Sequence, residues 1–172
     1  MTLNRIPIVI AGFATIFLIQ ESLVNRINFY VGGFSLYLAF FVAWIVFEER
    51  NSALVISFLA GLIADLSPTL EAPFGVWTFI FTGMGYLLAS SIRGSIDISN
   101  SPLSLTSVCM ISVTVALLAF RILSSILGVP MGSLGVVFQV LVGNAMWTFL
   151  LAPIFIPITR SVRKMSLTAR ER

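Results

Sequence analysis

Residues 29–47, FYVGGFSLYLAFFVAWIVF, form a run of 19 residues without a charged side chain. A helix needs about 20 predominantly apolar residues to cross the hydrocarbon core of a bilayer. The run is therefore typical of a membrane-spanning helix.

The rest of the chain has the same character. Of its 172 residues 58% are hydrophobic and 10% are charged, and its mean hydropathy is +1.05. Soluble domains carry about 25% charged residues, so most of this surface is expected to face lipid. Only helices and closed barrels cross lipid, and a barrel would show short alternating strands instead of long apolar runs. We therefore predict an all-α integral membrane protein, with residues 1–172 forming a single transmembrane domain.

We expect six transmembrane helices joined by short loops. Their predicted ranges are Ile6–Val24, Phe29–Phe47, Ala53–Leu66, Phe74–Ile92, Ser104–Leu127 and Leu134–Pro157. The first ends in Gln20-Glu21-Ser22 and not in a small-residue cleavage site, so we expect it to be retained as a helix. The third is the shortest, and a re-entrant segment is its other interpretation. Pro153 and Pro157 should kink or end the last helix.

The basic residues are distributed unevenly among the predicted loops. With six crossings, one side holds Arg5, Arg50, Arg93, Arg160, Arg163, Lys164, Arg170 and Arg172. The other side holds only Arg26 and Arg121. Because cytoplasmic loops carry the excess of Lys and Arg, both termini are predicted to be cytoplasmic. The basic tail, residues 160–172, is expected to meet anionic lipid head groups.

Three charged residues fall within or beside the predicted spans. Glu21, Asp65 and Arg121 should all lie in the outer third of the membrane. Intramembrane charges are costly and mark functional sites. We hypothesise an outer-leaflet cluster of Arg121 with Glu21 or Asp65. The simpler interpretations are that Asp65 bonds the turn before Pro68 and that Arg121 reaches the outer head groups.

Small residues recur at helical spacing on the third and fourth predicted helices. Ser57, Gly61 and Asp65 are four residues apart, and Gly85 and Ala89 repeat the spacing. Such faces let two helices approach closely. They are predicted to pack the third and fourth helices together or to bind the helix of a partner.

The chain lacks the residues that most catalytic sites use. It has no histidine, and Cys109 is its only cysteine. The seven acidic residues are scattered, and no Gly-rich phosphate loop is present. We therefore expect no enzymatic activity, no metal and no cofactor. The basic charge is explained by membrane orientation, so no nucleic acid is expected as a partner.

The segment from Arg50 to Gly94 resembles the MreD family of rod shape-determining proteins. It reads RNSALVISFLAGLIADLSPTLEAPFGVWTFIFTGMGYLLASSIRG and covers about a quarter of the chain. That family has a G-F-x-x-G-L-x-x-D-like helix, a short outer loop and a Gly-led helix with a G-Y-L-like element. The matching positions are Gly61, Leu62, Asp65, Gly75, Gly85, Tyr86 and Leu87. The sequence departs from the pattern at Ser57, often Gly in the family, and in the slightly long loop Thr69–Pro73.

The resemblance implies a non-enzymatic scaffold of the cell-elongation complex in the bacterial inner (plasma) membrane. Such a protein binds MreC, acts with RodA and a penicillin-binding transpeptidase, and is linked indirectly to MreB. It helps to organise lateral peptidoglycan synthesis and cell shape. The resemblance also implies a fold similar to the S components of energy-coupling-factor transporters.

Two other functions stay open. An S-component-like subunit of a vitamin transporter would carry an A-x-x-x-A motif on its first helix, where this chain has Ala11 and Thr15. It would also need a pocket of converging polar or aromatic groups. The candidates for that pocket are Trp77, Asn144 and Trp147. A small multidrug-type protein or an ion channel would need a polar path, for which only Gln139 and Asn144 are candidates.

Overall fold

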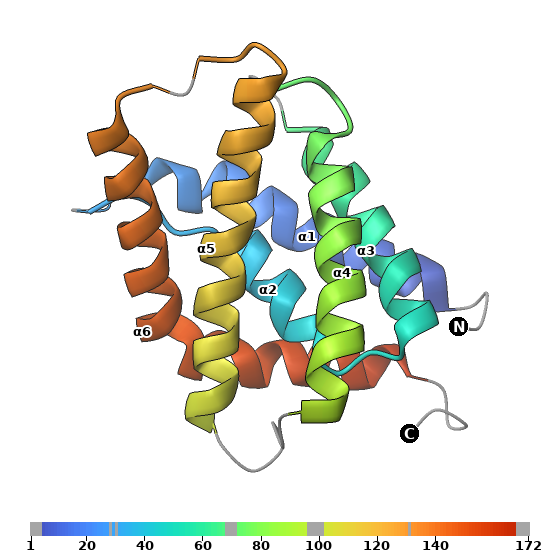
Figure 1. The fold of residues 1–172 in the computed structure, drawn as a ribbon. Coiled ribbons are helices and arrows are strands. Elements are labelled where there is room, and N and C mark those ends of the chain that lie inside the picture. The colour runs from blue at the N-terminus through green and yellow to red at the C-terminus, as the bar shows by residue number, and fades with distance from the viewer. Residues whose placement is uncertain are drawn as a thin grey trace.

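The computed structural model describes residues 5–27, 29, 31–67, 72–95, 102–130 and 132–167, with only the backbone for 91–95 and 102. Within these ranges the chain is helical and contains no strand, as predicted. The elements are α1 (Ile6–Ser22), a 3₁₀ helix η2 (Val24–Arg26), α2 (Leu36–Ile45), α3 (Arg50–Asp65), α4 (Val76–Ser95), α5 (Pro102–Ile126) and α6 (Leu134–Ser166). Figure 1 shows their arrangement.

The six α-helices pass back and forth between two ends of one bundle (Figure 1). At one end, Glu48 after α2 binds Arg5 before α1 and Arg163 near the end of α6. We call this the charged end. At the other end, Ser67 after α3 donates a 2.8 Å hydrogen bond to Glu21 at the end of α1. We call it the cavity end, because a cavity described below opens there.

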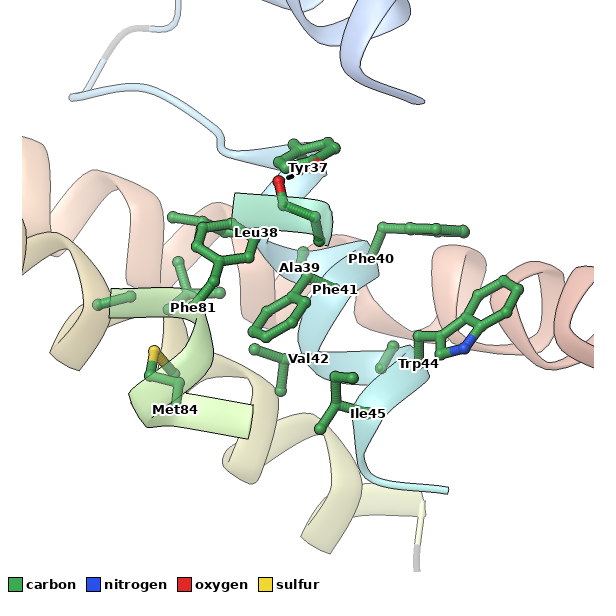
Figure 2. Close-up of a cluster of buried hydrophobic side chains, with 14 of the residues drawn as sticks. Tyr37, Leu38, Ala39, Phe40, Phe41, Val42, Trp44, Ile45, Phe81 and Met84 are labelled. Atoms are coloured by element: carbon green, nitrogen blue, oxygen red, sulfur yellow. Dashed lines mark hydrogen bonds between the residues drawn. The ribbon is translucent and has the colours of Figure 1, made fainter. Parts of the chain in front are cut away.

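Helix α2 lies at the centre of the bundle, and all residues from Tyr37 to Ile45 are buried. A helix that is apolar all round is stable only where neighbours surround it. Figure 2 shows Phe81 and Met84 of α4 against this helix. The ring centroids of Phe41 and Phe81 are 4.3 Å apart, and the Tyr37 hydroxyl donates a 2.7 Å hydrogen bond to the carbonyl of Ala60 in α3.

The predicted second span, 29–47, is wrong as a continuous helix, because only its second half is helical. Before α2, Gly32 has φ +60° and lies directly against the backbone of Gly143 in α6. The side chain of Gln20 accepts a hydrogen bond from the Tyr37 N–H and donates one to the Phe34 carbonyl. Side-chain and backbone groups of α1 and α6 thus bond or contact the irregular segment before α2.

Helix α6 continues beyond Pro157, where the predicted last span ended, as far as Ser166. Figure 1 shows that it bends, so that its final part runs along the charged end. Pro153 and Pro157 lie inside the helix and each lacks the N–H that would bond the preceding turn. The prolines therefore kink the helix without ending it. Arg170 and Arg172 lie outside the described residues.

Among the described residues, three helical stretches are long and apolar enough to cross a membrane: Ile6–Arg26, Leu103–Ile126 and Leu134–Ser166. The prediction of six spans is not met by length, because α2 has ten residues where a span of 19 was predicted, and α3, predicted to be short, has 16. At 1.5 Å per residue, α2 covers about 15 Å, roughly half of a bilayer core. Large apolar side chains are exposed along the long helices, for example Ile111, Ile122 and Phe138. An exposed apolar surface of this kind is consistent with an all-α membrane protein.

Candidate functional site

Asp65 joins the end of α3 to the first turn of α4. Its carboxylate accepts 3.0 Å hydrogen bonds from the backbone N–H groups of Trp77 and Thr78 and a 2.5 Å bond from the Thr78 hydroxyl. The carbonyl of Gly75 accepts the bond that begins α4. A residue in that place usually caps the helix with its own side chain, which glycine lacks. Asp65 supplies the cap from the neighbouring helix.

The predicted small-residue faces meet each other between α3 and α4. A Cβ atom added at Gly61 would overlap the backbone of Thr78, and one added at Gly85 would overlap the side chain of Ser57. Ala89 is also buried, one turn beyond Gly85. Of the two predicted uses of these faces, the structure shows packing within the chain.

A cavity of about 410 Å³ opens at the cavity end, where α1, α3 and α5 finish and α2 and α4 begin. Its wall includes two of the three charged residues of the predicted cluster, Glu21 and Arg121. Asp65 belongs to the α4 cap instead. Glu21 and Arg121 face the same space without forming an ion pair.

The two charges of the cavity differ in their surroundings. The carboxylate of Glu21 accepts hydrogen bonds from Asn25, at 3.1 Å, and from Ser67, at 2.8 Å. The half-buried guanidinium of Arg121 has no hydrogen-bond or ion-pair partner within the described part of the chain. The Ser124 hydroxyl, one helical turn further along α5, is buried and also lacks a partner there. The cavity therefore contains donors that the protein leaves unused.

An aromatic wall forms the other part of the cavity. The rings of Trp77 and Phe120 are stacked, with centroids 4.4 Å apart and an interplanar angle of 7°. Phe81 meets Trp77 edge to face at 5.7 Å. Because Asp65 holds the N–H of Trp77, the α3–α4 junction also positions this wall.

The charged end contains a buried ion cluster that the sequence analysis missed. Glu48 is 2% exposed and lies between Arg5 and Arg163. Arg5 reaches both carboxylate oxygens, one of them at 3.2 Å, while Arg163 Nε lies 2.8 Å from Glu48 and its Nη2 donates to the Phe47 carbonyl at 2.6 Å. The only signal in the sequence is that Glu48 directly follows the apolar run 29–47, between two predicted spans, and this position does not indicate burial.

The remaining candidates do not converge on the cavity. Asn144 is buried and its side chain donates to the Val140 carbonyl, whereas Gln139 is exposed, so these two residues do not line one polar path. Trp147 packs against Phe29, with ring centroids 5.2 Å apart. Ala11 and Thr15 are both exposed on α1. No protein-family model matches the chain, and no curated protein or solved structure matches it.

Proposed function

We propose that the chain is a non-enzymatic membrane scaffold of the MreD kind, which binds MreC and helps to organise the cell-elongation complex in the bacterial inner membrane. The observation that carries the proposal is the structure of the α3–α4 unit. The residues behind the resemblance, above all Gly61, Asp65, Gly75 and Gly85, cooperate in one compact junction. Residues that contact and support one another specify a fold more strongly than the same residue types at unrelated positions.

In the scaffold proposal the chain crosses the membrane six times, and three of the crossings are made by helices that are shorter or less apolar than a usual span. The alternation of the six helices between the two ends supports it. The basic residues support it too: Arg5, Arg50, Arg160, Arg163 and Lys164 belong to the charged end, and Arg26 and Arg121 to the cavity end. Under the positive-inside rule the charged end is cytoplasmic.

Cysteine labelling tests this topology. In a Cys109→Ala background, a cysteine at exposed Glu49 should react with a membrane-impermeant maleimide only after the membrane is opened. A cysteine at exposed Asn25 should react in intact spheroplasts. Reaction of both positions from the same side would contradict the alternation.

Partner capture tests the scaffold itself. The tagged chain is purified in mild detergent from the membrane of its own host, and co-purifying proteins are identified by mass spectrometry. We expect MreC together with the RodA–transpeptidase pair. Asp65→Ala, which breaks the α3–α4 junction, should lower this recovery, whereas Glu49→Gln at an exposed position should not. Recovery of neither MreC nor RodA would count against the scaffold.

The cavity favours a second candidate, the S-component-like transporter subunit. Its size lies within the range of about 300–1,000 Å³ that is usual for small-molecule sites. In that case the same purification should recover a transmembrane transport subunit with ATPases. A bulky substitution on the exposed α1 face, Thr15→Trp, should then abolish that recovery.

A further inference from the structure

We propose that the cavity binds a zwitterionic ligand, with a primary ammonium group beside Glu21 and a carboxylate or phosphate group beside Arg121. The inference does not rest on the scaffold proposal. A scaffold could hold a lipid head group there, and a transporter subunit could hold its substrate.

The charges of the cavity select this class of ligand. Glu21 and Arg121 both line the space, do not pair with each other, and together carry no net charge. A purely anionic ligand would satisfy Arg121 but bring a second negative charge near Glu21. A purely cationic ligand would satisfy Glu21 but bring a second positive charge near Arg121. A zwitterion satisfies both residues at once.

The α5 side of the cavity is suited to an oxyanion. Arg121 and Ser124 are three residues apart and therefore lie on the same face of α5. The guanidinium offers a planar fork of donors that matches a carboxylate or phosphate, and it has no partner in the described chain. Ser124 is 5% exposed, lines the cavity and has a hydroxyl without a partner. A buried hydroxyl is normally hydrogen-bonded, so its free state indicates a missing partner.

The α1 side is suited to an ammonium group. Asn25 and Ser67 each donate one hydrogen bond to Glu21, and these bonds fix the carboxylate in place while leaving it acceptor capacity. Trp77 and Phe120 line the same cavity and form a stacked aromatic pair against which an apolar body can pack. The volume of about 410 Å³ fits an amino-acid-sized molecule or a lipid head group.

Two binding assays on the purified full chain test the inference and distinguish the sources. In the lipid assay, native mass spectrometry compares retention of phosphatidylethanolamine with that of phosphatidylglycerol, which lacks the ammonium group. In the soluble assay, calorimetry compares L-phenylalanine with 3-phenylpropionate, which also lacks the ammonium group. We expect at least a tenfold preference for the zwitterion in one assay, and that assay identifies the source.

Matched variants show whether the cavity is responsible. Glu21→Gln and Arg121→Gln should each reduce binding of the preferred zwitterion at least tenfold, and Arg121→Lys should reduce it less. Arg26→Gln removes an exposed arginine at the same end that does not line the cavity, and should leave binding unchanged. Thermal unfolding confirms that each variant is folded. The proposal is overturned if neither assay shows the preference, or if the Arg121 and Glu21 variants bind like the unchanged chain.

Discussion

Asp65 stabilises the junction of α3 and α4 because it satisfies backbone N–H groups in the first turn of α4. The first N–H groups of a helix have no partner within the helix, and lipid offers none. Gly75, with φ +101°, allows the chain to turn into α4 but provides no side chain for capping. The carboxylate, 5% exposed, serves the N–H groups of Trp77 and Thr78 and also places a negative charge at the positive end of the helix dipole.

Replacing Asp65 tests this role. Asp65→Ala leaves two N–H groups unsatisfied, which costs about 1–3 kcal/mol for each buried group. We expect a loss of about 3 kcal/mol in stability, measured by thermal or SDS unfolding in detergent. Asp65→Asn keeps one acceptor oxygen and should lose less. Thr78→Val removes only the hydroxyl bond and should lose about 1 kcal/mol. Equal stability of the Ala and Asn variants would contradict the cap.

At the scale of elements, α3 and α4 pack closely because glycine removes side-chain atoms where their backbones approach. Adding a methyl group at Gly61 or Gly85 forces the helices apart and should cost about 1–3 kcal/mol. Gly83 provides a matched control on the same helix, since it is exposed and a Cβ there meets nothing within 4 Å. Gly83→Ala should be neutral or gain up to about 1 kcal/mol from helix propensity. Unfolding midpoints of the three Ala variants check this ordering.

The sequence predicts helix contacts well where small residues recur at helical spacing. It predicts helix boundaries less well where contacts with other helices determine them. The small-residue spacing of Ser57, Gly61 and Gly85 led directly to the α3–α4 contact. The apolar run 29–47 predicted a helix but not where α2 would begin. That boundary depends on Gln20 and Gly143, which lie in other helices and bond or contact the chain before α2.

The candidate site also has features that the sequence predicts and features that depend on tertiary structure. The order of the predicted spans indicated that Glu21 and Arg121 belong to the same end of the molecule, and the structure places both on one cavity. No spacing rule indicates that they stay unpaired, because that depends on how far apart α1 and α5 hold them. Trp77 was a candidate from its residue type, whereas its stacking partner Phe120 is indistinguishable in sequence from the other apolar residues of α5.

At the scale of the whole molecule, the ion cluster at the charged end joins the first and the last helix to the central helix α2. Arg5 precedes α1, Glu48 follows the buried helix α2, and Arg163 lies in the bent part of α6. Arg5 also reaches Ser166, with 3.4 Å between Nε and the hydroxyl oxygen. One carboxylate thus connects three segments that are distant in sequence. The bent part of α6 runs along this end of the bundle (Figure 1).

This arrangement predicts an unequal effect of removing its members. Glu48→Gln leaves two arginines without a counter-charge, and breaking a buried ion pair costs about 3–5 kcal/mol. Arg5→Gln or Arg163→Gln leaves Glu48 paired with the remaining arginine and should cost less. Glu49→Gln changes the exposed neighbouring acid and should be close to neutral, within about 0.5 kcal/mol.

Unfolding in detergent at low and at high salt measures the stability of the four variants. Because Glu48 is shielded from solvent, the loss in its variant should persist at high salt. A loss that vanished with salt, or one no larger than that of Glu49→Gln, would mean that the cluster does not hold the bundle together.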